Sequence, residues 1–466
     1  MLEQEAADYR AVNENPCHMC MPLGAILPFK GVERAMVLIH GSQGCSTYMR
    51  RHLAEHFHEP IDVASSALNE QGTIYGGEAS LKKGLDNLVK LYQPGVIGIL
   101  TTCLAETIGE DTARVAADYL REKRPPGLHL ITVSTPGYGG THSEGYFLAL
   151  RRIVVSLTGR SEKHPAINII APHLSPADLR EIKRILELWQ VDYILLPDFS
   201  ETLDGPLARP YKKIPPGGTR VRDIARMGGA RATIQLGLTV DDAISPGCYL
   251  AEECGVPLYK LPVPTGLANT DLFMELLGQL TGRPLPASLA RERGRLLDCM
   301  IDAHKHNAQG RAVIFGEPEI VYAVTSFCLE NGIEPVVVAT GSNDHRLPGL
   351  LKNRLEETGA SPCFLREADF QRIREKSRER EANIAIGHSD GRYLTEKEGI
   401  PLVRHGFPIH DRVGGQRLLS VGYAGSIMFL DRITNTLLES KHQNYRLRLY
   451  QAFYRPAGPD SRQEEG

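Results

Sequence analysis

The chain of 466 residues lacks the features that point to a membrane or to nucleic acid. It has no apolar run approaching the ~18–20 residues that a membrane-spanning helix needs, and no signal-peptide pattern at its acidic N-terminus. Its formal net charge is only -3 at pH 7, which gives no electrostatic reason to expect a polyanionic partner. These absences argue against membrane and nucleic-acid partners, and they predict a cytoplasmic protein.

The nine cysteines form neither a disulfide framework nor a zinc-finger pattern. Their odd number argues against complete pairing, and thiols stay reduced or bind metal in a reducing compartment. Cys17 and Cys20 form one C-x-x-C pair, but no second pair follows at the spacing of a structural zinc site. For Cys17 the sequence leaves open a spare ligand, a redox-active thiol or a neutral neighbour.

What the chain does contain is a regular alternation of short apolar runs and longer helical stretches. Its length is about three times that of a usual domain, so two or three domains are expected. Runs that are apolar on both faces and alternate with helices are typical of parallel sheets. The pattern predicts an α/β protein with three Rossmann-like, doubly wound parallel-sheet domains. The expected strands are 36–39, 96–100, 128–133, 166–171, 193–196, 232–236, 258–261, 311–315, 334–338, 382–386 and 401–403, and the expected helices are 78–92, 112–123, 176–189, 318–331 and 347–358.

Two segments indicate where domains end. The polar segment 158–165 ends in proline, and the charged helical segment 287–307 precedes the strand at Arg311. The predicted domains are therefore residues 1–163, 164–308 and 309–466. A helix from Gly425 to about Lys441 is expected to pack on the last domain, and the tail 455–466 is expected to be mobile.

Cys20, Cys45 and Cys103 each lie in a short segment beside glycine or proline, where each thiol is expected at a strand end. The carboxyl ends of parallel strands converge on one crevice, so distant cysteines can meet there. Thiolates are the ligands that iron–sulfur clusters require, and glycine lets backbone pass close to a bulky cofactor. A single cysteine is more often buried packing. The spacing alone leaves a metal cluster and packing about equally favoured.

The motifs around these cysteines continue along nearly the whole chain, and together they resemble the β-type subunit of nitrogenase component 1. They are Asn15-Pro16, Cys20-Met21-Pro22-Leu23-Gly24-Ala25, His40-Gly41-Ser42-Gln43-Gly44-Cys45, His56-Phe57-His58-Glu59-Pro60, Tyr75-Gly76-Gly77, Thr101-Thr102-Cys103-Leu104-Ala105-Glu106, Pro197-Asp198-Phe199-Ser200, Leu203-Asp204-Gly205, Gly217-Gly218, Gly387-His388-Ser389, Gly406-Phe407-Pro408-Ile409-His410-Asp411-Arg412 and Gly422-Tyr423. The resemblance implies the nitrogenase component 1 fold.

The resemblance also implies a cofactor and partners. Cys20, Cys45 and Cys103 match the β-side ligands of an [8Fe-7S] electron-relay cluster, the P-cluster, shared with a homologous α-type subunit in a heterotetramer of two α-type and two β-type chains. A [4Fe-4S] cluster is the alternative. Because one chain supplies only part of the ligand shell, it is not expected to hold the cluster alone. Substrate reduction is implied in the α-type subunit, so no catalytic residue is expected here.

Two further residues take their expected roles from the same resemblance. Thr141 lies where catalytic nitrogenases often carry a serine that can bind the oxidised cluster. Its hydroxyl is either a ligand or, as the commoner alternative, a loop hydroxyl bonded to backbone. Tyr75 corresponds to an aromatic on the surface where an ATP-dependent [4Fe-4S] iron protein docks, and aromatics are favoured interface anchors.

Several functions within this family stay open. The early position of Cys20, which leaves little N-terminal extension, and the segments 203–205 and 413–417 favour the β-type subunit of a nitrogenase cofactor assembly scaffold, with a [4Fe-4S] cluster. Retention of all three cysteines favours electron relay in a reductase. The prediction is a nitrogenase-like oxidoreductase most similar to methylthio-alkane reductase, which cleaves carbon–sulfur bonds. The scaffold, a nitrogenase β-subunit and a tetrapyrrole-reducing relative are the alternatives.

Overall fold

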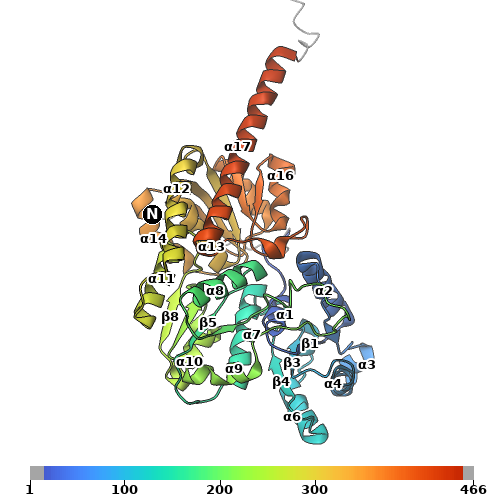
Figure 1. The fold of residues 1–466 in the computed structure, drawn as a ribbon. Helices are drawn as coiled ribbons and strands as arrows, with labels where there is room; N and C mark the ends of the chain where they lie inside the picture. Colours follow the sequence, from blue (N-terminus) through green and yellow to red (C-terminus); the bar gives the residue numbers. More distant parts are fainter. Residues whose placement is uncertain (1–14, 455–466) are drawn as a thin grey trace, which may run out of the picture.

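The computed structural model describes residues 15–454, which form three parallel sheets surrounded by helices (Figure 1). The first sheet has the order β2 (Ala64–Ser65), β1 (Ala35–His40), β3 (Val96–Thr101), β4 (His129–Val133). The second has the order β6 (Tyr193–Leu196), β5 (Ile167–Ile170), β7 (Ala232–Leu236), β8 (Leu258–Leu261). The third has the order β11 (Cys363–Leu365), β10 (Glu334–Thr340), β9 (Arg311–Gly316), β12 (Ile384–Gly387), β13 (Leu402–Arg404). These sheets confirm the expected α/β class with Rossmann-like layers.

Helices connect the strands and cover both faces of the sheets. In the first third of the chain they are α1 (Met21–Lys30), α2 (Gln43–Phe57), α3 (Glu70–Tyr75), α4 (Glu78–Tyr92), α5 (Cys103–Thr107), α6 (Thr112–Lys123) and α7 (His142–Leu157). The middle third has α8 (Pro176–Leu188), α9 (Val221–Arg226), α10 (Pro246–Cys254), α11 (Leu267–Thr281) and α12 (Ala287–Asn307). The last third has α13 (Pro318–Glu330), α14 (Leu347–Thr358), α15 (Phe370–Glu379), α16 (Arg392–Glu398) and α17 (Gly422–Tyr454).

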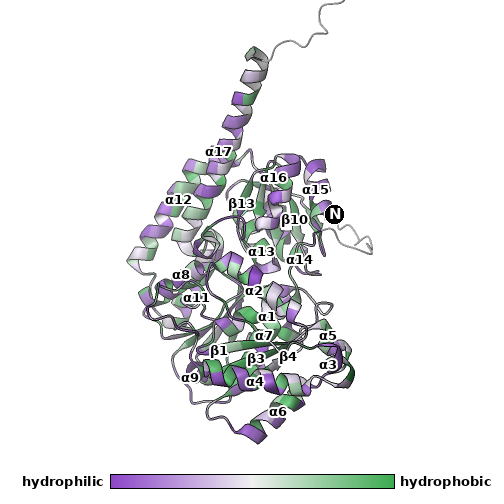
Figure 2. Ribbon diagram, turned by 90° about the vertical axis from the view of Figure 1, so that its right-hand side faces the viewer, coloured by the Kyte–Doolittle hydropathy of each residue, from purple (hydrophilic) through white to green (hydrophobic). Residues whose placement is uncertain are grey.

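The central strands are buried on both faces, as a sheet covered by helices requires. Every residue of β1, β3, β5 and β7 is buried. Figure 2 shows β1 and β3 as apolar segments beside helices that carry more polar residues. Continuous runs of valine, isoleucine and leucine therefore mark strands that helices cover on each side.

The crossing of α1 and α7 joins the first sheet to the rest of the molecule. Nine of the ten residues of α1 are buried, which suits a helix that is apolar all round. The two helices approach very closely at two glycines. A methyl group on Gly24 would lie 1.8 Å from the carbonyl oxygen of His142, and one on Gly145 would lie 2.0 Å from that of Met21. Only glycine fits at these positions.

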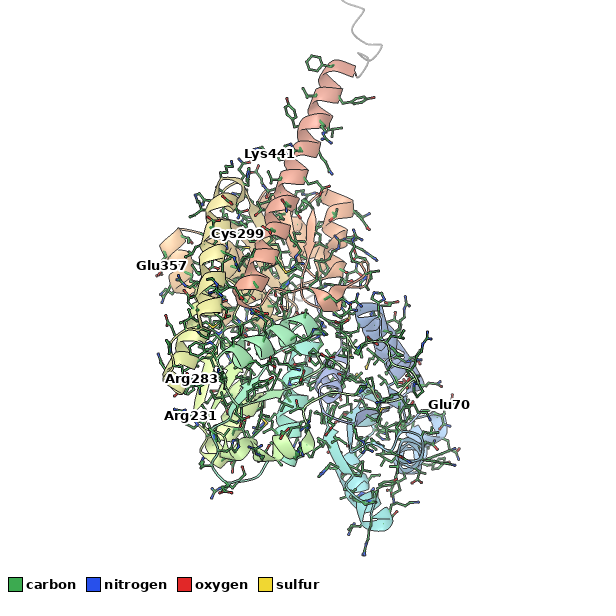
Figure 3. All side chains as sticks on the ribbon, in the orientation of Figure 1. Glu70, Arg231, Arg283, Cys299, Glu357 and Lys441 are labelled. Carbon is green, nitrogen blue, oxygen red and sulfur yellow. The ribbon has the colours of Figure 1, made fainter. Side chains whose placement is uncertain are left out.

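The expected domain limits stay a prediction. The three sheets fall within 35–133, 167–261 and 311–404, inside the proposed boundaries. However, α12 from the expected middle domain packs along α17 from the last one. Helix α17 continues past Lys441 and leaves the body of the molecule (Figure 3), so it is longer than expected. The tail 455–466 lies outside the described residues, among which no helix is long and apolar enough to cross a membrane.

Candidate metal centre

Two of the three candidate cysteines follow neighbouring strands of the first sheet. Strands β1 and β3 are paired along their length and end opposite each other at His40 and Thr101. Cys45 lies in the first turn of α2, and Cys103 is the first residue of α5. Gly41 lets the two strand ends approach, since a methyl group there would lie 2.0 Å from Thr102 Oγ1. The topology therefore brings both thiols to one edge of the sheet.

Cys20 reaches the same edge by a different route. It does not follow a strand, so the expected strand-end position is wrong for this residue: Cys20 is the residue before α1 and makes an isolated antiparallel bridge with Thr141. A methyl group on Gly137 would lie 2.9 Å from Cys20 Sγ and 3.2 Å from Cys103 Sγ. The amide of Gly137 also donates a hydrogen bond to Cys103 Sγ, at 3.0 Å. The thiols of Cys20 and Cys103 thus both lie against the same glycine.

The three thiols also influence one another electrostatically. Partial burial raises the pKa of the Cys20 thiol to about 11, and the neighbouring Cys103 and Cys45 thiols contribute to the rise. Three thiolates in one place therefore repel each other. Cys20, Cys45 and Cys103 would be held as thiolates by cationic iron, which would offset that repulsion. The donor set fits an iron–sulfur cluster chemically.

Two of these thiols are more exposed than the other cysteines, and Cys45 is half-buried like Cys248, Cys254 and Cys299. Cys20 and Cys103 are exposed and Cys45 is half-buried, whereas Cys328 and Cys363 are buried. Within residues 15–454, no three His, Cys, Asp or Glu side chains gather closely enough to hold a single metal ion. Whether the three thiols bind a cluster stays a prediction.

Cys17 differs from its neighbour Cys20 in its exposure and in the side chains that it contacts. Its side chain is 1% exposed and lies in the core of the third sheet, with Sγ 3.5 Å from His388 Nε2. Burial, with nearby Asp390 and Glu317, raises the pKa of the Cys17 thiol. Of the three roles that the sequence left open, the structure favours a neutral thiol that anchors the N-terminal segment.

Thr141 has a structural role in this fold. It is the N-cap of α7, its Oγ1 accepts a hydrogen bond from the Ser143 amide at 3.3 Å, and it forms a capping box with Glu144. The same hydroxyl is hydrogen-bonded to Ser342 Oγ at 2.9 Å, and the residue is buried. This bonding matches the loop-hydroxyl alternative. Ligation by Thr141 stays a prediction that requires these bonds to rearrange.

Tyr75 lies at the surface, on an element that is tied to the Cys45 segment. It is the last residue of α3 and is 82% exposed. The Gly77 amide donates a hydrogen bond to Glu110 Oε1 at 2.6 Å, and Glu110 Oε2 lies 3.3 Å from Nε2 of the buried His40 at the end of β1. Glu110, which the sequence did not single out, links the Tyr75 surface to the strand that leads to Cys45. Docking through Tyr75 stays a prediction.

Two residues that support the Cys20 segment, His142 and Glu317, could not be recognised from the sequence. His142 Nε2 lies 2.8 Å from Glu317 Oε1, and both side chains are buried. Burial alone would raise the pKa of Glu317, but the hydrogen bond from His142 and the nearby histidines lower it to about 2. Glu317 is 175 residues away in sequence, so no local motif could have connected the pair.

Aromatic and histidine side chains fill the place where the three sheets meet. His56 and His173 pack edge-on against Phe407, with ring centroids 4.9 and 4.7 Å away. Two cavities beside them measure about 10 and 20 Å³, which is room for about one water molecule each. This interior is therefore too full for a large ligand.

The chain is similar over most of its length to known nitrogenase subunits. The family described as nitrogenase component 1 type oxidoreductase matches residues 20–438. The nitrogenase molybdenum-iron protein beta chain of Clostridium pasteurianum is 34% identical over 94% of this chain and 95% of its own. That of Methanococcus maripaludis is 36% identical over 94% and 97%. The nitrogenase vanadium-iron protein beta chain of Trichormus variabilis is 34% identical over 92% and 95%.

Solved structures agree with these relatives. A chain of the structure titled "Nitrogenase Cp1 at pH 6.5" superposes with a TM-score of 0.89 at 34% identity, covering 95% of this chain and 97% of its own. A chain of "Nitrogenase Cp1 at pH 5" shares the fold, with a TM-score of 0.69 at 15% identity over 94% and 92%. The chain therefore belongs to the nitrogenase component 1 type oxidoreductases and is a subunit of the β-chain type.

Proposed function

We propose that this chain is the electron-relay subunit of a nitrogenase-like two-component reductase. Cys20, Cys45 and Cys103 would bind an [8Fe-7S] cluster together with a homologous α-type subunit. The observation that carries the proposal is that the Cys20 and Cys103 thiols both lie within 3.2 Å of the one position that a methyl group on Gly137 would take, at the surface edge where Cys45 also lies. When bound, such a cluster passes single electrons from an ATP-dependent iron protein to a cofactor in the α-type subunit.

The residues of this chain would bind and orient, and would not react with substrate. The thiolates supply one side of a ligand shell, and their exposure leaves the other side to the α-type partner. The exposed Tyr75 would form part of the surface for the iron protein, because its helix is held by Glu110 against the strand that precedes Cys45. The two cavities of about 10 and 20 Å³ between the sheets leave no room for a substrate at that place, and the proposal puts reduction in the partner.

The proposed substrate class is methylthio-alkanes, with reductive cleavage of a carbon–sulfur bond. The relatives named as molybdenum-iron and vanadium-iron nitrogenase beta chains make dinitrogen the second candidate. A cofactor assembly scaffold with a [4Fe-4S] cluster is the third outcome that an experiment must distinguish.

The test is Cys103→Ala in the complex with its α-type partner, assayed with the iron protein, ATP and a reductant. Removing one thiolate leaves an iron atom without its ligand, so we expect reduction to fall below a tenth of the wild-type rate while the α-subunit cofactor is retained. Iron content and electron paramagnetic resonance spectra separate loss of the cluster from loss of the cofactor.

Cys248→Ala is the matched control, because Cys248 also lies in the first turn of a helix and is half-buried. It should keep full activity. A wild-type complex that reduces neither methylthio-alkanes nor dinitrogen, yet donates a cofactor precursor to an empty nitrogenase, would replace the reductase with the scaffold.

A further inference from the structure

His142 holds the backbone of the residue before Cys20 at two points. The backbone amide of His142 donates a hydrogen bond to the carbonyl oxygen of Met19 at 3.0 Å. The amide of Met19 donates in return to His142 Nδ1, at 3.1 Å. His142 thus fixes both backbone polar groups of Met19, the residue immediately before Cys20.

The second bond fixes the tautomer of the His142 ring. Because Nδ1 accepts a hydrogen bond from Met19, it carries no proton, and the ring proton lies on Nε2. Nε2 is 2.8 Å from Glu317 Oε1, so this proton is donated to the carboxylate. The other Glu317 oxygen has no hydrogen-bond partner, and His173 Nδ1 is 3.9 Å from Oε1. His142 therefore donates to the Glu317 carboxylate through Nε2 and accepts from the Met19 amide through Nδ1.

We propose that His142, held in one tautomer by Glu317, is a positioning residue for Cys20 in cluster binding. This inference rests on the proposed function. The carboxylate comes from the end of β9 in the third sheet, whereas Cys103 and Cys45 are set by the first sheet. Cys20 therefore takes its place from a contact between two sheets. Groups that orient a ligand from behind typically change metal affinity by about 10–100-fold when they are removed.

Three substitutions of His142 separate the positioning of Cys20 from the general stability of the protein. In His142→Asn the amide oxygen occupies the region of Nδ1 and can accept from Met19, but the side chain is too short to reach Glu317. In His142→Gln the amide can reach Glu317, but the acceptor for Met19 is lost. His142→Leu removes both bonds. The control is His56→Leu, since His56 Nδ1 also accepts a buried backbone amide, that of Ile409 at 2.8 Å, away from Met19.

The experiment uses the complex with the α-type partner, purified without oxygen. The interfacial cluster is followed by its electron paramagnetic resonance signature and midpoint potential, and its loss to an iron chelator is timed. We expect His142→Leu and His142→Gln to lose the cluster about 10–100-fold faster than wild type. We expect His142→Asn and His56→Leu to lose the cluster at a rate within about threefold of wild type. This should hold even where their melting temperatures fall as far as those of His142→Leu and His142→Gln.

The outcomes distinguish the inference from the proposed function. Equal loss rates and an unchanged potential in all four variants, with the wild-type signature present, would overturn the positioning role and leave the relay function standing. A rise in loss rate that follows melting temperature, His56→Leu included, would overturn it as well. A wild-type complex without any interfacial cluster signature would overturn both.

Discussion

At the scale of single residues, the absence of a side chain at Gly137 is as informative as the thiols beside it. Cys20 Sγ and Cys103 Sγ both lie against the position where a side chain on Gly137 would begin, and the Gly137 amide donates a hydrogen bond to Cys103 Sγ. The sulfur of a cysteine is placed by a single rotatable bond, χ1. A thiol can therefore avoid an added methyl group only by changing to another rotamer. The site therefore depends on a residue that supplies no ligand.

We expect Gly137→Ala to reduce cluster occupancy of the complex to less than half of wild type. The new methyl group would lie 2.9 Å from Cys20 Sγ and 3.2 Å from Cys103 Sγ, which displaces at least one thiol. Iron analysis and electron paramagnetic resonance give the occupancy, and thermal unfolding of the same samples gives the stability. Gly349→Ala is the control, since that position has open space around it. Full occupancy in Gly137→Ala would show that the thiols do not converge there.

The candidate ligand residues could be recognised in the sequence because each one lies in a local motif, and their ligation of a cluster stays a prediction. Cys45 and Cys103 follow apolar runs, and parallel strand ends share one edge. The supporting residues could not be predicted, because His142 and Glu317 meet only through packing between sheets. Thr141 shows the same limit: its partner Ser342 is 201 residues away.

At the scale of elements, the crossing of α1 and α7 determines where Cys20 and Thr141 lie. Cys20 immediately precedes α1, Thr141 immediately precedes α7, and the two residues form a bridge. The close approach of the helices at Gly24 and Gly145 thus sets the position of both candidate residues.

We expect Gly145→Ala to lower the free energy of unfolding by about 1–3 kcal/mol, as overpacking of a tight core does. Its methyl group would lie 2.0 Å from the Met21 carbonyl oxygen, so the helices must separate. Urea unfolding followed by circular dichroism measures the change. Gly278→Ala, in α11 with its nearest neighbours at 3.5 Å, should be neutral or stabilising by up to about 1 kcal/mol. Equal stability of the two variants would contradict the close crossing.

Most strands and long helices could be predicted, whereas the long helices α2, α7 and α11 and most short elements could not. Helices α4, α6, α12 and α14 begin and end where their periodicity and flanking residues predict. Strands β2 and β11 have two and three residues, too few for a periodic signal. Helix α1 was missed because its apolar residues surround it and Pro28 lies inside it.

At the scale of the whole molecule, the proposed function makes the site half of a larger one. We expect the chain expressed alone to bind little iron, and co-expression with the α-type subunit to restore a cluster, because one chain offers only three thiolates at that edge. Iron per chain after anaerobic purification is the measurement. A stable, stoichiometric [4Fe-4S] cluster in the isolated chain would mean that its ligand set is complete.

Three buried histidines at the junction of the sheets make the assembled fold sensitive to acid. Burial lowers the pKa of His56 to about 3, of His173 to about 4 and of His405 to about 3, from an ordinary value of 6.5. His56 lies in α2, which follows β1 of the first sheet. His173 follows β5 of the second sheet, and His405 follows β13 of the third. Protonating any one of them places a charge between the sheets.

The sign of the pH dependence follows from where the protons bind. Below pH 6.5 the unfolded chain takes up a proton at each of these histidines and the folded chain does not, so stability is lost as pH falls from 6.5 toward 4. Each histidine should cost about 1 kcal/mol between pH 6.5 and 5.5. His405→Phe keeps the ring that stacks on Phe429 but removes one titrating group. In urea unfolding at the two pH values, the variant should lose about 1 kcal/mol less than wild type. An identical loss in both proteins would mean that the pKa of His405 is the same in the folded and the unfolded chain.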